Sequence, residues 1–97
     1  MRIISFKKFR EASEKYPECA KQLRLFYEDL KKKNFDNSNQ VKEHFPYVSL
    51  LKDNRVVFNV HGNKYRVVVK FNFEMNICYV RFVGTHSEYD KIDANTV

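Results

Sequence analysis

The sequence predicts an α+β domain in which two N-terminal helices pack on one face of a small antiparallel β-sheet and a short C-terminal tail or helix follows. Apolar residues recur at helical spacing through residues 6–30, and from Asn54 the pattern changes to runs rich in Val, Phe and Tyr. The chain has 97 residues, of which 43% are hydrophobic and 31% charged. These values suit one globular domain spanning residues 1–97 rather than a disordered chain.

The N-terminal part reads as a short strand followed by two helices. Residues 2–4 predict the strand, and Ser5 is placed to cap a helix. The apolar face of that helix consists of Phe6, Phe9, Ala12 and Tyr16. Pro17 ends this run, and a second helix follows with an apolar face made of Cys19, Ala20, Leu23, Phe26, Tyr27 and Leu30.

The second helix ends in three lysines, residues 31–33. Lysines at a helix C-terminus complement the helix dipole, and they could equally contact a nucleic acid. Residues 34–40 form a polar connector, and residues 39–45 predict one short helical turn before Pro46.

Three strands are predicted in the second half of the chain, over residues 55–60, 64–73 and 77–83. Two-residue loops, Gly62-Asn63 and Met75-Asn76, would join them as tight hairpins. These loops fix the register. The expected pairs in the first hairpin are Val60–Tyr65, Phe58–Val67, Val56–Val69, Asn59–Arg66, Val57–Val68 and Arg55–Lys70. The expected pairs in the second are Phe73–Cys78, Phe71–Val80, Val69–Phe82, Lys70–Arg81 and Arg66–Thr85.

This register gives the sheet one apolar face and one basic, polar face. The polar face would carry Asn59, His61, Lys64, Arg66, Lys70, Tyr79 and Arg81. One side of an antiparallel sheet usually meets water, which explains a polar face without any ligand. However, Lys70 opposite Arg81 would be a destabilising like-charge pair, which favours an anion held between them.

The formal net charge is +6, with 18 basic and 12 acidic residues. Such a surplus favours a polyanionic partner, above all a nucleic acid. No apolar stretch is long enough to span a membrane or to form a signal peptide, so we expect a cytoplasmic protein. Cys19 and Cys78 stand alone and are expected to be buried thiols, and no metal or cofactor is expected.

The stretch from Arg81 to Asp93 places His86 and Tyr89 where the last strand ends. Metal-free RNA cleavage needs a proton acceptor for the ribose 2′-hydroxyl, a role that His86 could fill. It also needs cations around the phosphate, which Arg66 and Arg81 could supply. A histidine at a strand end is also commonly a plain surface residue. The nearby carboxylates are Glu88, Asp90 and Asp93, which either form a solvated helix end or orient His86.

The stretches NRVVFNVHGNKYRVVVKFNF and CYVRFVGTHSEYDKID resemble the HigB toxin family of bacterial type II toxin–antitoxin systems. The resemblance extends over nearly the whole chain and implies a RelE-like fold. It also implies an mRNA interferase that cleaves messenger RNA, commonly on the ribosome. The implied partner is a HigA-like helix-turn-helix antitoxin, through which alone the protein would meet operator DNA.

Carried over residue by residue, the resemblance assigns catalytic roles to Arg66, Arg81, His86 and Tyr89. The residues expected to bind RNA are Asn59, Lys64, Lys70, Tyr79 and Lys91. General-base chemistry would fall to His86 or Lys64, and His86 is favoured. The competing interpretation is a non-catalytic module, a decayed toxin whose basic face docks RNA or the antitoxin.

Overall fold

The computed structural model describes residues 1–62 and 64–97, and it confirms the predicted α+β class. The five-stranded sheet has the order β1-β5-β4-β3-β2. Its strands are β1 (Arg2–Ile4), β2 (Val48–Leu50), β3 (Arg55–Val60), β4 (Tyr65–Asn72) and β5 (Ile77–Thr85). The helices are α1 (Phe6–Lys15), η1 (Pro17–Cys19), α2 (Ala20–Lys32), α3 (Ser38–His44) and α4 (His86–Tyr89).

The sheet is mixed rather than purely antiparallel, because β1 pairs with β5 in parallel. The strand β2, which the sequence pattern did not indicate, adds an antiparallel edge beside β3. Ser5 precedes α1 but makes no side-chain cap, since its backbone is left-handed with φ 79°. In α3, by contrast, the side chain of Asn37 accepts a hydrogen bond from the Gln40 N–H and caps the helix.

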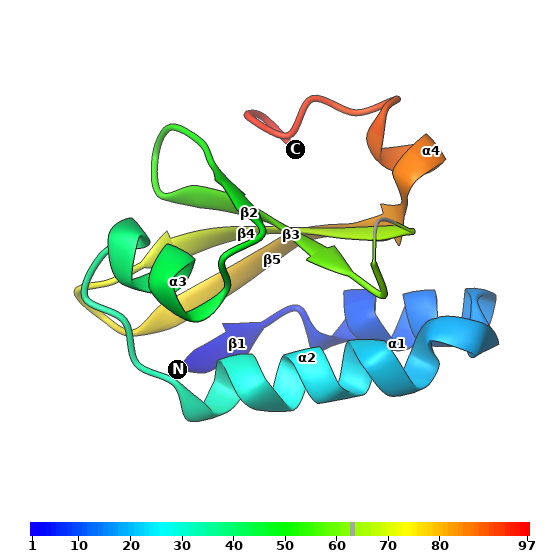
Figure 1. Cartoon of the computed structure of the whole chain (residues 1–97), viewed down its shortest axis with the longest axis horizontal. Helices are drawn as coiled ribbons and strands as arrows, with labels where there is room; N and C mark the ends of the chain where they lie inside the picture. Colours follow the sequence, from blue (N-terminus) through cyan, green and yellow to red (C-terminus); the bar gives the residue numbers. More distant parts are fainter. Residues whose placement is uncertain (63) are drawn as a thin grey trace.

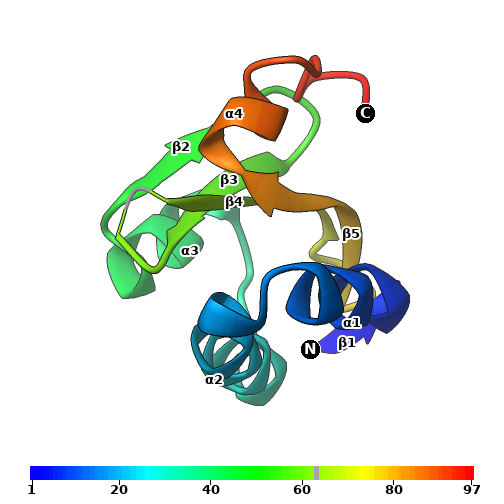
Figure 2. The same ribbon diagram turned by 90° about the vertical axis from the view of Figure 1, so that its right-hand side faces the viewer.

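The helices α1 and α2 cover one face of the sheet, here called the first face, and α4 with the C-terminal segment lies over the opposite, second face (Figure 1, Figure 2). The main core fills the first face. Phe58 lies at the centre of this core and is 1% exposed. The centroid of its ring lies 5.0 Å from that of Phe26 and 5.2 Å from that of Phe45. From α2, Leu23 and Leu30 reach this core seven residues apart, as two turns of one helix face require.

The predicted register of the first hairpin is confirmed, from Arg55 opposite Lys70 to Val60 opposite Tyr65. Of its proposed Gly62-Asn63 loop, Asn63 lies outside the described residues.

The predicted register of the second hairpin is wrong. Phe71 pairs with Cys78 instead of Val80, so residues 73–76 form a longer connection than the expected two-residue loop. The Asn72 side chain accepts the Met75 N–H, and Asn76 takes a positive φ of 55°, which together close this wider turn.

A bulge in β5 shifts the register once more at Arg81. Val69 pairs with Val80 and Val68 with Phe82, so Arg81 has no partner in the ladder. As a result Phe82 lies on the second face instead of opposite Val69 on the first. Lys70 therefore faces Tyr79 and not Arg81, which removes the expected like-charge pair.

Candidate nucleic-acid interface

The register arranges the second face in three rows of side chains across β3, β4 and β5. The row nearest the β3–β4 hairpin consists of Asn59, Arg66 and Gly84. The middle row consists of Val57, Val68 and Phe82. The far row consists of Arg55, Lys70 and Tyr79. At about 3.3 Å per residue, the first and third rows lie roughly 13 Å apart along a strand.

The middle row is covered by the C-terminal segment, residues 90–97. Val68 is fully buried and Ala94 is 8% exposed in a small second core that Tyr89 and Ile92 help to close. Arg55, itself 8% exposed, donates from Nη1 to the carbonyl oxygens of Ala94 at 3.2 Å and Val97 at 2.7 Å. The expectation of an open polar face is therefore wrong along this row, because apolar strand residues there bury the segment.

At the hairpin end, α4 positions His86. The Thr85 side chain accepts the Glu88 N–H, and the Glu88 carboxylate accepts the Thr85 N–H, which forms a capping box. The His86 N–H donates to the Lys64 carbonyl at 2.9 Å, which ties α4 to the hairpin. The His86 Nδ1 lies 3.1 Å from an Asp90 carboxylate oxygen, one helical turn further on. The nearby carboxylates were expected either to form a solvated helix end or to orient His86. The position of Asp90 favours the second role.

Arg66 and Tyr89 meet beside this helix. The Arg66 guanidinium carbon lies 6.0 Å from the centre of the Tyr89 ring, and its Nη1 donates to the Tyr65 carbonyl at 3.4 Å. Tyr89 in turn packs near the Phe82 ring, with 6.4 Å between centroids. The structure thus brings Arg66, His86 and Tyr89 to one end of the second face. We call these three residues the α4 cluster.

The other predicted RNA-binding residues at this end are exposed. Asn59 on β3 pairs with Arg66 on β4. Lys64 directly precedes β4, next to α4. Lys91 lies on the exposed turn that follows α4, where its N–H donates to the Glu88 carbonyl.

Arg81 lies outside the row that holds Arg66, because it is the unpaired residue of the β5 bulge. With Lys70 and Tyr79 it lines a cavity of about 610 Å³, which Asn54 and Glu74 also border. The Arg81 Nε donates to the Val97 carbonyl at 3.1 Å, on the far side of the covered middle row. Arg66 and Arg81, which were both expected to be catalytic, therefore lie in different surroundings, because the bulge and the C-terminal segment separate them. We call Lys70, Tyr79 and Arg81 the β5 cluster.

Gly84 allows α4 to approach the sheet closely. A Cβ atom at this position would lie 2.7 Å from Cζ of Phe82 and 2.8 Å from Oε1 of Glu88. Both groups support the α4 cluster, so the absence of a side chain at Gly84 belongs to the geometry of the site.

Sequence reasoning missed two residues that support the second face, Arg55 and Lys15. Arg55 was expected only as a member of a strand pair, yet it fixes the C-terminal segment. Lys15 extends from α1 to place its Nζ 2.9 Å from the Glu88 carboxylate. No spacing in the sequence indicates either contact, because each joins residues far apart in the chain. The link between His86 and Asp90 did carry a signal, their i,i+4 spacing on a helix.

The Glu88 carboxylate should make the stability of the protein depend on pH. Its hydrogen bonds to Lys15 and to the Thr85 N–H lower the pKa of Glu88 from 4.5 to about 2. The stabilisation is therefore present above about pH 4.5 and is lost as the pH falls towards 2. Since the Glu88 side chain is 35% exposed, solvent screens its interactions with Lys15 and Thr85. We therefore expect them to contribute about 1 kcal/mol or less to the free energy of unfolding. Urea unfolding of the parent and Glu88→Gln proteins should differ at pH 7 and converge near pH 2; a constant difference would contradict this account.

The two cysteines are free, buried thiols. Cys19 and Cys78 are both fully buried, as predicted, and burial raises the pKa of Cys78 to about 12, which keeps its thiol neutral. Within residues 1–62 and 64–97, no three His, Cys, Asp or Glu side chains gather as possible metal ligands. No helix in this described part is long and apolar enough to cross a membrane.

Comparisons with known proteins match most of the chain. Residues 19–92 match the HigB toxin family, described as the RelE-like toxic component of a toxin–antitoxin system. The chain is 39% identical over 92 residues to the mRNA interferase toxin HigB of Escherichia coli strain K12, covering 93% of this chain and 88% of that protein. It is 33% identical over 94 residues to the mRNA interferase HigB of Escherichia coli O6:H1, covering 95% and 91%. The resemblance found in the strand and tail motifs is confirmed.

Proposed function

Because the chain belongs to the RelE-like HigB toxin family and is the toxic component of a toxin–antitoxin system, we propose that it cleaves messenger RNA on the translating ribosome. A HigA-like helix-turn-helix antitoxin restrains it, and both act in the cytoplasm. The observation that carries the chemistry is the α4 cluster, where an exposed imidazole, a guanidinium and a phenol lie together at the end of the sheet.

His86 acts as the general base in this proposal. The Asp90 carboxylate, 3.1 Å from Nδ1, favours the tautomer in which Nδ1 carries the proton, which leaves Nε2 to take the proton from a ribose 2′-hydroxyl. The 2′-oxygen then forms a bond to the adjacent phosphorus, and the bond from phosphorus to the 5′-oxygen breaks. The products are a 2′,3′-cyclic phosphate and a 5′-hydroxyl, whose proton comes from the Tyr89 phenol or from protonated His86.

Arg66 stabilises the charge that develops on the phosphate oxygens during this step. Its planar guanidinium can donate to two oxygens at once, and its carbon lies 6.0 Å from the centre of the Tyr89 ring. Asn59 and Lys64 bind the neighbouring backbone.

Lys70 and Tyr79 lie roughly 13 Å along the strands from the row of Arg66, so we assign the β5 cluster to a more distant part of the same RNA strand. There Tyr79 offers a surface for a base to stack on, and Lys70 and Arg81 contact phosphates. Arg81 is therefore proposed as a binding residue rather than as a participant in bond breaking.

The competing function is a non-catalytic module that docks RNA through the same exposed cations. Purified protein incubated with translating ribosomes separates the two when new 5′ ends of the message are mapped. The proposed toxin creates new ends inside reading frames, and an Arg66→Ala, His86→Ala double variant does not. A binding module would leave every message intact while it associates with ribosomes in a salt-sensitive way.

A further inference from the structure

The cavity at the β5 cluster holds more than the cations and the ring that a phosphate and a stacked base require. Its volume is about 610 Å³, within the range of sites that hold small ligands. Its lining also includes the carboxylate of Glu74 and the amides of Asn54 and Asn72. Glu74 belongs to the turn between β4 and β5, which lies at the opposite end of the sheet from α4 (Figure 1). A carboxylate repels a phosphate, so Glu74 indicates a contact with another part of a nucleotide.

The Glu74 carboxylate is exposed and is not neutralised by the cations that line the same cavity. Within residues 1–62 and 64–97, it forms no ion pair with Lys70, Arg81 or any other basic side chain. Arg81 instead donates from Nε to the Val97 carbonyl at 3.1 Å. Both oxygens of the Glu74 carboxylate can therefore accept hydrogen bonds from a ligand.

Asn72 presents a donor in the same cavity. Its side-chain oxygen accepts the Met75 N–H at 3.1 Å, so its amide nitrogen remains to donate to a ligand. Asn72 and Lys70 are two residues apart on β4, and Tyr79 pairs with Lys70, so all three lie on the second face. The cavity thus combines an acceptor, a donor and an aromatic ring beside two cations.

We propose that this cavity selects guanine as the base of one nucleotide in the bound RNA. The Watson–Crick edge of guanine places two donors, N1–H and the 2-amino group, side by side, and the Glu74 carboxylate accepts from both. The guanine O6 accepts from the Asn72 amide, and the base stacks on Tyr79. Lys70 and Arg81 contact the neighbouring phosphate. That the nucleotide belongs to a message rests on the proposed function, whereas the choice of base rests on the groups in the cavity.

The other three bases fit these groups less well. Adenine and cytosine each present one amino group next to an unprotonated ring nitrogen, whose lone pair would face the carboxylate. Uracil presents a single N–H between two carbonyl oxygens, which a carboxylate repels. We expect guanine to bind roughly ten- to a hundredfold more tightly than the other bases, the usual discrimination of one bidentate contact.

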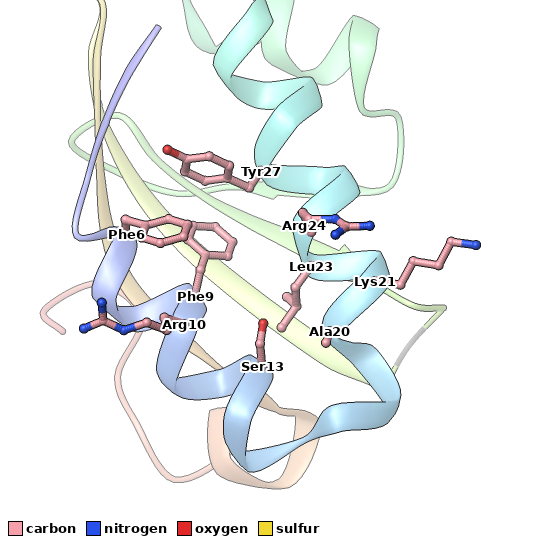
Figure 3. Close-up of a pocket in the computed structure, with 9 residues that line it drawn as sticks. All are labelled: Phe6, Phe9, Arg10, Ser13, Ala20, Lys21, Leu23, Arg24 and Tyr27. Carbon is pink, nitrogen blue, oxygen red and sulfur yellow. The ribbon is translucent and has the colours of Figure 1, made fainter.

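The apolar groove between α1 and α2 lacks these groups, although cations and aromatic rings line it as well (Figure 3). Arg10, Lys21 and Arg24 extend outward from this groove. Among the described residues that line it, none carries a carboxylate or an amide side chain. The groove can attract a phosphate but has no pair of acceptors for the edge of guanine, so we place the selective site at the β5 cluster.

The binding of RNA that cannot be cleaved tests this proposal in the full-length chain. The ligands are fluorescent 2′-O-methyl oligonucleotides of uridine with one central guanine, adenine, cytosine or hypoxanthine, and they lack the 2′-hydroxyl nucleophile. Fluorescence anisotropy gives the dissociation constant of each ligand. The parent should prefer guanine, and hypoxanthine, which has N1–H but no 2-amino group, should lose most of that preference.

Glu74→Gln should reduce the guanine preference by about tenfold, because its single neutral amide oxygen cannot accept from both donors. The readout is a ratio between bases, so the general gain in RNA affinity on removal of a negative charge cancels. The matched control Glu28→Gln makes the same change on an exposed residue of α2 and should keep the parental preference.

Several results would overturn the proposal. These are equal affinity of the parent for all four bases, preference for a base other than guanine, or an unchanged guanine preference in Glu74→Gln. Displacement of the oligonucleotide by guanosine 5′-monophosphate as effectively as by unlabelled oligonucleotide would also overturn it, because the cavity would then serve a free nucleotide. Glu74 is exposed, and thermal unfolding verifies that the variant folds. The hypoxanthine ligand tests the same contact without any mutation.

Mapping of message ends on translating ribosomes, run in parallel, keeps the two proposals apart. A parent that selects guanine but cuts no message refutes the proposed function and retains this inference. A parent that cuts messages but binds the four oligonucleotides equally refutes this inference alone.

Discussion

Replacing His86 by alanine should lower the rate of message cleavage by about 10²- to 10⁴-fold, the usual contribution of a positioned general base. The side chain is 52% exposed and packs in neither core, so its loss should leave the fold intact. The measurement is the single-turnover rate at which a defined message is cut on programmed ribosomes. Thermal unfolding of the variant serves as the check on folding.

Asp90→Asn provides the matched control, since it keeps the size of the side chain and removes its charge. Asp90 acts only through His86, so this positioning residue should affect the cleavage rate less than His86 does and should change its pH profile. If His86→Ala cleaves at the parental rate, His86 is not the base, and Lys64, the alternative cation next to α4, takes its place as the candidate.

Local patterns in the sequence were sufficient for the helices and for the first hairpin. Phe9 and Ala12, and Leu23 and Leu30, show the spacing of one buried helix face, and both pairs are buried. In the first hairpin, a shift by one residue would move Phe58 and Val67 out of the core, so only one register buries them. The structure confirms that register.

The second hairpin could not be predicted in the same way, because alternation of apolar and polar residues fails as a guide where both faces are covered. Val80, Phe82 and Val83 are apolar on both sides of the Arg81 bulge, so several registers bury them equally well. The covering C-terminal segment is itself inconspicuous in sequence, with only Ile92, Ala94 and Val97 as apolar residues after α4.

This difference explains which parts of the candidate site were anticipated. The α4 cluster depends on short-range order, because Thr85 caps the helix and His86 and Tyr89 follow directly. The separation of Arg81 from Arg66 depends on the bulge and on contacts between β5 and the chain's last residues. Such long-range contacts leave no periodic signal in the sequence.

Replacing Arg66 by alanine should reduce the cleavage rate by about 10²- to 10³-fold, the loss typical for one contact that stabilises developing charge. Arg66→Lys keeps the charge but not the planar pair of donors, so it should recover only part of the rate. Growth arrest on expression and single-turnover cleavage should both follow this order. An Arg66→Ala protein as toxic as the parent would refute the assignment of the α4 cluster.

Comparison with Arg81→Ala then decides whether the site has one cationic centre or two. Because the bulge turns Arg81 towards Lys70 and Val97, its loss should weaken message binding, seen as a higher KM, and leave the bond-breaking step almost unchanged. Tyr79→Ala should show the same pattern, since it lines the same cavity. Should Arg81→Ala instead lower the single-turnover rate as much as Arg66→Ala, the C-terminal segment must move during catalysis. The hydrogen bonds from Arg55 to Ala94 and Val97 would then have to break before the two arginines meet at one phosphate.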